Sequence, residues 1–477
     1  MPFSPKLIRI VRRLILSLAI FATLIALAIV IENWRGNRAW KKYAAEHSIK
    51  GVTLDALPGP SKLPPETNFF KTPVLDRWVF EHKTADFLQK IQSPEYSSIE
   101  NIKKWTRGTS PDFADYVKRI SQIRTRRNLP EITLSSTTTP AGQLLQLLAP
   151  MEPVLFELRQ AAKQRPESQL ARPTALDWKN PFTRPTPDYY FARTIATTLS
   201  IHAAASLTER QIAVAFDDTL AGLKFSRGFT SAPDTLLIEA LTGSLLYLFT
   251  LQPVWQGQQQ HAWNAEQLLA FQKEIGQADL VDSLSRSFET EQTEFLCALD
   301  NVQTFTWGEA FGSFKIFPHG WLQQNKITAC ELLASQRAVS GARATPDFLN
   351  KLLAPVKYPP GFGSPFSPYT LIAAISIPGY EKTMQNVVDR QSFLTLAATA
   401  CALERHWLAH GNYPETLAEL VPTYLDKVPL DIVNGDPLRY WRNDNGRFTL
   451  YSIGLDGKDD GGDLKKDWTW PQPAETR

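Results

Sequence analysis

The sequence lacks the short motifs by which many catalytic centres are recognised. Its 477 residues include no GxSxG nucleophile elbow, no Walker-type phosphate loop and no GxGxxG turn after a predicted strand. The only cysteines are Cys297, Cys330 and Cys401, and they have neither CxxC nor Cys/His metal spacing. We expect three buried thiols, with a Cys297–Cys330 disulfide as the alternative. The absence of motifs weakens an enzymatic interpretation without excluding it, because catalytic residues can be scattered along a chain.

A strong charge of either sign is also missing. The chain has 51 Lys and Arg against 48 Asp and Glu, which gives a formal net charge of +3. These charges are spread along the whole sequence. Nucleic-acid binding is therefore not favoured, because it requires a concentrated basic surface.

One uncharged apolar stretch lies near the start of the chain. Leu14 to Ile31 is rich in Leu, Ile and Ala and has about the length that crosses the hydrocarbon core of a bilayer. We expect a single-pass membrane anchor at 14–31, preceded by a basic N-terminal segment at 1–13. Basic residues lie on both sides of the stretch, so the positive-inside count does not decide its orientation. They are Lys6, Arg9, Arg12 and Arg13 before it, and Arg35, Arg38, Lys41 and Lys42 after it.

A cleaved signal peptide is the alternative to a retained anchor. Ala26-Leu27-Ala28 has the small-x-small pattern of a cleavage site. The apolar run nevertheless continues through Val30 and Ile31, beyond that site. This continuation favours an uncleaved signal-anchor.

Proline-rich stretches divide the region that follows. Leu57 to Pro65 cannot sustain a helix, because proline lacks the amide donor and restricts the residue before it. We therefore expect 32–109 to be a juxtamembrane and proline-rich linker region. A second proline-rich stretch runs from Arg172 to Pro187.

Residues 110–354 are predicted to form a helical body. Phe191–Leu207 and Glu209–Phe225 are apolar at helical spacing and meet at Thr208, whose spacing to Gln211 fits a capping box. This pattern predicts a helical hairpin. Further helices are expected to begin at Ser231, at Asn264 and, as the last long helix of the body, over Asp279 to Leu299. Because no consensus residues recur, a helical bundle or irregular helical-hairpin body is favoured over a solenoid.

The sequence changes character after a proline- and glycine-rich connection at 355–380. Glu381 to His410 is predicted as a helix of about eight turns that ends at Gly411, a residue that tolerates positive φ. Three informative segments follow this helix. They are Gly411-Asn-Tyr-Pro-Glu-Thr-Leu-Ala-Glu-Leu-Val-Pro422, Tyr424-Leu-Asp-Lys-Val-Pro-Leu-Asp431 and Asn434-Gly-Asp-Pro-Leu-Arg-Tyr440.

These segments, in this order, resemble the soluble domain of the major (G-type) pseudopilins of type II secretion. The resemblance implies a long helix that ends in a glycine-tyrosine-proline turn, then a short helix and a small antiparallel sheet packed across the long helix. Leu438–Trp441 and Phe448–Ser452 have the composition of strands, and Asn443 to Gly446 suits the turn between them. The predicted fold is thus mainly α with a C-terminal α+β module at 381–477.

An acidic loop near the C-terminus resembles the calcium-binding loop of the same family. It begins as Tyr451-Ser-Ile-Gly-Leu-Asp-Gly-Lys-Asp-Asp-Gly-Gly-Asp463. The resemblance implies a structural Ca²⁺ ion, because carboxylates and carbonyls on a glycine-turned loop suit this cation. A true EF-hand is rejected, since Lys458 replaces a ligand and Asp467 stands where Glu is needed. A solvent-exposed acidic turn without metal remains the alternative. The candidate ligands are Asp456, Asp459, Asp460, Asp463 and Asp467.

Two other pairs of polar residues lie one helical turn apart. Glu291 and Glu294 could form an acid/base or metal pair, but no matching His or carboxylate motif supports it, and a solvated acidic face is the favoured interpretation. His406 and His410 could hold zinc with a third ligand. Trp407, however, stands where a zinc protease has its catalytic Glu, and His410 suits a helix C-terminus.

The whole chain resembles large single-anchor bacterial membrane proteins that end in such a module. Arg12 to Ile15 offers no pseudopilin processing site, and about 350 residues separate the anchor from the module, so a filament subunit is not expected. The resemblance implies a single-pass protein of the bacterial inner membrane whose bulk is extracytoplasmic. We expect a structural or interaction protein with envelope protein partners, linked to secretion or pilus-like assembly. The alternative is an anchored extracytoplasmic hydrolase, in which His202, His261 or His319 would meet carboxylates in a pocket of the helical body.

Overall fold

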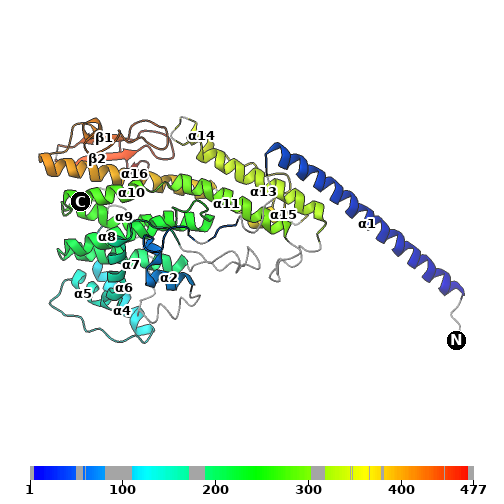
Figure 1. The fold of residues 1–477 in the computed structure, drawn as a ribbon, viewed down its shortest axis with the longest axis horizontal. Helices are drawn as coiled ribbons and strands as arrows, with labels where there is room; N and C mark the ends of the chain where they lie inside the picture. The colour runs from blue at the N-terminus through cyan, green and yellow to red at the C-terminus, as the bar shows by residue number, and fades with distance from the viewer. Residues whose placement is uncertain are drawn as a thin grey trace.

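The computed structural model describes residues 5–49, 57–59, 61–80, 110–170, 189–301, 317–343, 345, 347–364, 366–377, 381–444 and 446–470. Over these residues the chain is mainly helical, with a small antiparallel sheet near the C-terminus. An elongated body carries one long helix that projects from it, and the sheet lies at the opposite end (Figure 1). The predicted mainly helical fold with an N-terminal apolar helix and a C-terminal sheet is confirmed at this level. The proline-rich stretch Arg172 to Pro187 lies outside the described residues.

Helix α1 (Pro5–Glu46) is much longer than the apolar stretch that predicts it. Apolar side chains of this stretch are exposed, including Leu18 at 71 % and Phe21 at 62 %. The helix continues beyond Ile31 because no proline occurs before Pro58 to interrupt it. The second half of α1 packs against helix α13, whereas the first half projects freely (Figure 1).

The described residues of the segment Leu57 to Pro65, which are 57–59 and 61–65, lie against the body. Leu57 is buried, the amide of Gly59 bonds to Asp234 (3.3 Å), and the hydroxyl of Ser61 donates to Gln169 (2.6 Å). The prolines prevent a helix here, as predicted, but the segment is packed. The 3₁₀ turn η2 (Phe69–Lys71) and helix α2 (Pro73–Phe80) follow it.

Four short elements form the next layer of the body. Helix α4 (Phe113–Arg126) is capped by the side chain of Asp112. Helix α5 (Pro140–Leu148), the 3₁₀ turn η5 (Ala149–Met151) and helix α6 (Glu152–Gln164) then follow directly on one another. Each of these three has a proline in its first turn, where the missing amide donor costs least.

Three long helices form the centre of the body. They are α7 (Tyr189–Thr208), α8 (Ile212–Gly228) and α9 (Leu237–Gln259). Helices α7 and α8 form the predicted hairpin, but the predicted cap is wrong. The hydroxyl of Thr208 donates back to the carbonyl of Ala204 (3.1 Å), and the chain turns at Arg210, whose φ is +58°. Helix α9 starts six residues after Ser231, where the sequence predicted its beginning.

The body continues with helices α10 (Ala265–Gly276) and α11 (Leu280–Asp300). Asn264 and Gln267 form the predicted capping box of α10, and Asp279 caps α11. The long helix α13 (His319–Ser340) was not predicted, and it lies beside α1 and α11. The short helices α14 (Phe348–Leu353) and α15 (Leu371–Ser376) lie beyond it.

The C-terminal module begins with helix α16 (Glu381–His410), which has the predicted bounds. A 3₁₀ turn η9 (Leu417–Leu420) leads to strands β1 (Arg439–Arg442), β2 (Phe448–Ser452) and β3 (Trp468–Thr469). The strands form one antiparallel sheet in the order β1-β2-β3, in which Tyr440 pairs with Leu450 and Tyr451 with Thr469. Strands β2 and β3 contact α16.

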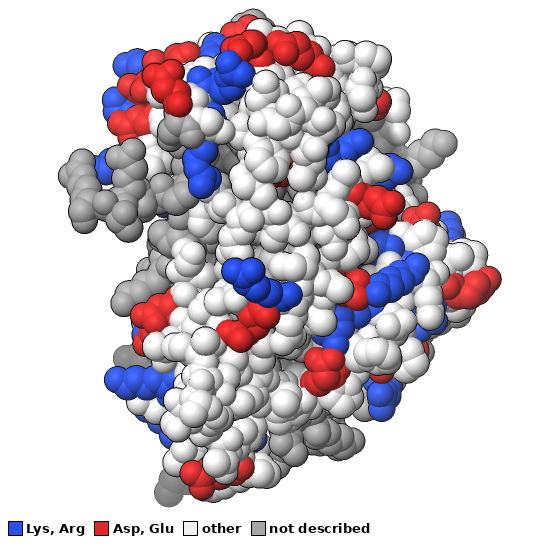
Figure 2. Space-filling view, turned by 90° about the vertical axis from the view of Figure 1, so that its left-hand side faces the viewer, with Lys and Arg blue, Asp and Glu red and all other residues white. Residues whose placement is uncertain are grey.

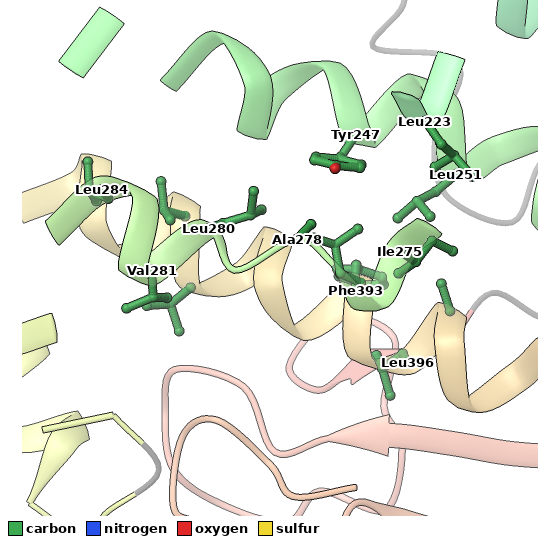
Figure 3. Packing of buried hydrophobic residues seen from close by; sticks show 14 of the residues in the cluster. Leu223, Tyr247, Leu251, Ile275, Ala278, Leu280, Val281, Leu284, Phe393 and Leu396 are labelled. Atoms are coloured by element: carbon green, nitrogen blue, oxygen red, sulfur yellow. The ribbon is translucent and has the colours of Figure 1, made fainter. Parts of the chain in front are cut away.

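One apolar core runs through the body and the C-terminal module. It joins Leu223 and Leu251 to Ile275, Phe393 and Leu396, so that α8, α9 and α10 share an interior with α16 (Figure 3). The sheet lies below α16 in this view, on the side of α16 that faces away from these helices. Burying each large apolar side chain stabilises the fold by about 1.5–3 kcal/mol. The C-terminal module is therefore held on the body by the packing of α16 against α9, α10 and α11.

Candidate functional site

Three of the five predicted loop carboxylates are bound within the loop or to the sheet. Asp459 accepts hydrogen bonds from the hydroxyl of Tyr451 (2.6 Å) and from Arg439 (3.0 Å). The Tyr451 hydrogen bond is the main cause that holds the pKa of Asp459 below its usual range. Asp456 and Asp463 each accept an amide two residues further along the chain, at 3.1 and 2.9 Å. These contacts stabilise the turns of the loop.

The other two carboxylates retain buried oxygens without a hydrogen-bond partner. Asp467 is 3 % exposed, and its Oδ2 accepts the amides of Gly462 (2.7 Å) and Asp463 (3.2 Å). Asp460 Oδ1 pairs with Lys466 (2.7 Å). Asp467 Oδ1 and Asp460 Oδ2 are buried and unbonded. Burial, assisted by the negative charge of Asp460, raises the pKa of Asp467.

The loop provides part of what a Ca²⁺ site needs. Among the described residues, no three His, Cys, Asp or Glu side chains converge as a metal-binding group. Ca²⁺ takes about six to eight oxygens, however, and backbone carbonyls and water supply many of them. The unbonded oxygens of Asp460 and Asp467 fit such a role, whereas Asp456, Asp459 and Asp463 are engaged elsewhere. The five-ligand set remains a prediction.

The helical body contains a group of four polar residues, of which sequence reasoning identified only the histidine. Arg159, His202 and Asp218 are buried, and Glu152 is partly exposed at their edge. His202 of α7 lies 2.6 Å from Asp218 of α8, and the other oxygen of Asp218 accepts from Arg159 of α6 (2.9 Å). Arg159 also pairs with Glu152, whose carboxylate lies 3.8 Å from the second ring nitrogen of His202. Burial pulls the pKa of Arg159 down, but the attraction of Asp218 and Glu152 outweighs it, so the pKa is raised. Arg159 therefore bonds to two carboxylates, and one of them, Asp218, also bonds to His202.

A second histidine–carboxylate pair joins the body to the C-terminal module. His261 follows α9 with φ of +47°, its ring stacks on Trp407, and its Nδ1 bonds to Glu404 of α16. Glu404 is 2 % exposed and also accepts from the hydroxyl of Tyr413 (2.7 Å). Burial, with the charge of Glu404, raises the pKa of Tyr413.

A small hollow lies beside this pair. Its lining consists of Gln258, Gln259, Glu404, Tyr413, Arg447, Phe448 and Trp470. Gln259 accepts from Arg447 (2.5 Å), and Gln258 accepts from the indole of Trp470 (3.2 Å). The hollow is therefore polar on the side of the body. Sequence reasoning identified His261 but not Glu404, which lies 143 residues away with no local signal.

The other predicted candidates have structural partners. His406 and His410 use Nδ1 for the carbonyls of Asn412 (3.0 Å) and His406 (2.9 Å). Glu291 accepts the amide of Leu237 at the start of α9 (3.4 Å). His319 bonds to the amide of Gln323 (2.7 Å), and burial lowers its pKa.

The three cysteines are buried free thiols that form no disulfide, so the predicted Cys297–Cys330 disulfide is wrong. Burial raises the pKa of Cys330 to about 12 and also raises that of Cys401. The expectation of buried thiols is confirmed. Such thiols are weak nucleophiles, since the thiolate is the reactive form.

The end of the molecule opposite the free half of α1 has a mixed surface. Acidic and basic side chains lie interspersed around broad uncharged areas, without a large patch of one sign (Figure 2). Comparison with protein-family models, with curated proteins and with solved structures gave no match.

Proposed function

We propose that this chain is a membrane-anchored structural or interaction protein of the bacterial envelope. In this proposal residues 14–31 cross the inner membrane once, and the body lies outside the cytoplasm. The free apolar half of α1 carries the proposal, because its side chains have no protein to cover them. A helix with so many exposed large apolar residues is stable in hydrocarbon and aggregates in water.

The second long apolar helix is not proposed to span the membrane. Helix α9 also has the length and composition of a spanning helix. Most of it is buried between other helices of the body, where Tyr247, Val254 and Trp255 belong to the core. Burial within the protein explains its apolar composition, which supports a single-pass arrangement.

The C-terminal module is proposed as the part that meets an envelope partner. The succession of α16, η9 and the antiparallel sheet agrees with what the resemblance to pseudopilin heads implies. The module lies far from the free half of α1, where it can reach an assembly outside the membrane (Figure 1). A link to secretion or pilus-like assembly follows from that resemblance.

A structural Ca²⁺ ion in the acidic loop is part of the same proposal. Asp460 and Asp467 would supply the carboxylate oxygens that lack partners, and loop carbonyls and water would complete the shell. The cation would remove the cost of burying two neighbouring negative groups. Its role would be to stabilise the loop.

Membrane fractionation of the full chain tests the anchor. The control is a Leu18→Arg/Leu24→Arg double variant, because each charge at the centre of a spanning helix costs about 2.5–3.5 kcal/mol. We expect the full chain to resist alkaline extraction, the variant to be released, and external protease to degrade the body in spheroplasts. N-terminal sequencing separates a retained anchor from a cleaved signal peptide. An extractable full chain would refute the proposal.

Cross-linking in intact cells tests the interaction role. A chain that works by contact is expected to yield a discrete larger species, which weakens when exposed residues of β1 such as Trp441 are changed to Glu. The Leu18→Arg/Leu24→Arg variant, which is not anchored, serves as the comparison at the same expression level. Finding only the monomer under all conditions would count against the interaction role.

An anchored extracytoplasmic hydrolase is the second candidate function. The observation that favours it is the order Tyr413–Glu404–His261, because a buried carboxylate that orients a histidine is how general bases are held. His261 is 35 % exposed, whereas His202 is enclosed by its partners. Turnover of chromogenic ester or peptide substrates that is lost in His261→Ala and kept in His202→Ala would establish it.

A further inference from the structure

The junction between α1 and α13 is a close helix crossing. Gly36 and Gly320 face each other, and a side-chain carbon on Gly320 would overlap the backbone of Glu32. Glycine at both positions lets the two backbones touch, as in small-residue helix contacts of membrane proteins. This contact holds the N-terminal end of α13 against α1, just beyond the apolar stretch.

Polar contacts set the register of this crossing. The side chain of Asn33 accepts the amide of Gly320 (2.8 Å), and the hydroxyl of Tyr369 donates to Glu32 (2.9 Å). Further along both helices, the ammonium of Lys326 on α13 lies 5.1 Å from the centre of the Trp40 ring on α1. This is an attractive cation–π distance. The N-terminus of α13 and the start of α15 are therefore held beside residues 32 and 33 of α1.

Residues 32 and 33 mark a definite height relative to a bilayer. Glu32 is the first charged residue after the apolar stretch that ends at Ile31. If that stretch fills the hydrocarbon, Glu32 lies where the headgroup layer begins. Whatever touches Glu32 and Asn33 lies at the same height.

The part of the body at this height is rich in aromatic residues. We name it the membrane-facing edge and define it as Phe317, Trp321 and Tyr369, which are linked by contacts to Glu32, together with Phe366, three residues before Tyr369 in the chain. Trp321 lies between Phe317 and Tyr369, with ring centres 5.4 and 6.4 Å apart. Phe366 is 93 % exposed, more than any other large apolar residue among those described. On α1, Trp34 is 61 % exposed at the same level.

We propose that the membrane-facing edge rests in the headgroup layer of the bilayer that α1 crosses, with Phe366 inserted into it. This inference rests on the proposed membrane span of α1. Trp and Tyr favour the membrane–water interface, since they combine an apolar ring with a polar tip. An exposed Phe beside them adds apolar area that the bilayer can bury. The continuity of the edge with the end of the apolar stretch identifies the bilayer as its occupant. The body would thus lie against the membrane at a fixed angle.

Site-specific probes on the full chain test the inference. One cysteine is added as Phe366→Cys and labelled with an environment-sensitive fluorophore. The labelled full chain is reconstituted in vesicles of phosphatidylethanolamine and phosphatidylglycerol. The native thiols are buried, so an unmodified chain serves to confirm that they stay unlabelled. Ile20→Cys reports the middle of the apolar stretch. Phe156→Cys is the matched body control, because Phe156 is also an exposed apolar residue, at 55 %.

Quenchers of two kinds locate each probe. We expect a shallow lipid-attached quencher to act on position 366 several-fold more strongly than on position 156, and a deep one to act on position 20. A probe at 366 that is quenched only by aqueous iodide, with position 20 still in lipid, would overturn the inference and leave the membrane span intact. A probe at position 20 that is also in water would instead refute the span itself. Unchanged melting temperatures of the labelled variants confirm that each is folded.

Discussion

The helical body and the C-terminal loop bury carboxylates in opposite ways. In the body, Asp218 is fully buried and both its oxygens are bound, one by Arg159 and one by His202. In the loop, Asp467 is almost as buried, yet one of its oxygens has no partner. A buried polar atom without a hydrogen bond costs about 1–3 kcal/mol. The closed group in the body is complete as a structural element, whereas the open one in the loop is suited to a ligand.

The largest expected effect comes from removing Asp218, the buried carboxylate that binds Arg159 and His202. Asp218→Ala leaves Arg159 buried without its main partner, and breaking a buried ion pair in this way costs about 3–5 kcal/mol. Its neighbour Asp217 forms a surface pair with Lys163 (2.6 Å), and Asp217→Ala should cost about 0–1 kcal/mol. Urea unfolding of the full chain in detergent, followed by circular dichroism, measures both. Equal losses in the two variants would show that burial of the pair does not matter.

The next largest expected effect comes from Ca²⁺ binding to the unbonded carboxylate oxygens of the acidic loop. Ca²⁺ at about 100 times its Kd should stabilise the folded chain by about 2.7 kcal/mol, because only the folded loop binds it. Asp467→Asn should abolish this gain. Asp456→Asn is the matched control, since the Asp456 carboxylate holds only the amide of Lys458 in its own turn. Thermal melts with and without Ca²⁺ test this prediction. Identical melting temperatures in both conditions would show that the loop is an acidic turn without bound metal.

Glu404 is an intermediate case between the two regions. It is buried like Asp218 and bound by Tyr413 and His261, but His261 reaches solvent. Glu404→Gln keeps the shape and one acceptor while it removes the charge, so we expect a loss of about 1–2 kcal/mol. The Glu404–His261 pair also links the body to α16. We therefore expect the loss of stability in Glu404→Gln to depend on the presence of His261. In a double-mutant cycle with His261→Ala, the two effects should be non-additive, and strict additivity would contradict a direct interaction.

The sequence predicted local features better than contacts between distant residues. The capping box of Asn264 and Gln267, the helix Glu381–His410 and strand Phe448–Ser452 all depend on neighbouring residues, and the structure has them. Helix α13 was missed because its buried face includes Asn325, Lys326 and Gln336, which weaken the apolar period. Their partners come from distant segments, as when the side chain of Asn325 donates to the carbonyl of Pro368 and accepts the amide of Ile372.

The candidate site was predictable only in part for the same reason. The acidic loop is contiguous in sequence, so all five carboxylates could be named as candidates. Which of them keep free oxygens depends on Tyr451 and Arg439, whose positions the folded sheet sets, and on Lys466 in the turn of the loop. The partners of His202 and His261 come from other helices. Composition and spacing carry no signal for such pairings.

The smallest expected effect is a difference in pH dependence within the loop. Burial raises the pKa of Asp467 in the folded chain, so its contribution to stability is present below the unfolded pKa and is lost as pH rises through the folded pKa. The hydrogen bond from Tyr451 lowers the pKa of Asp459, so its contribution is present above the unfolded pKa and is lost as pH falls through the folded pKa. Without Ca²⁺, Asp459→Asn should therefore be costlier at neutral than at acid pH, and Asp467→Asn should be costlier at acid pH. Denaturant midpoints at several pH values measure both slopes. If the stability loss of both variants changed with pH in the same direction, the two carboxylates would share one environment. The contrast between hydrogen-bonded and unbonded carboxylates would then not hold for the loop.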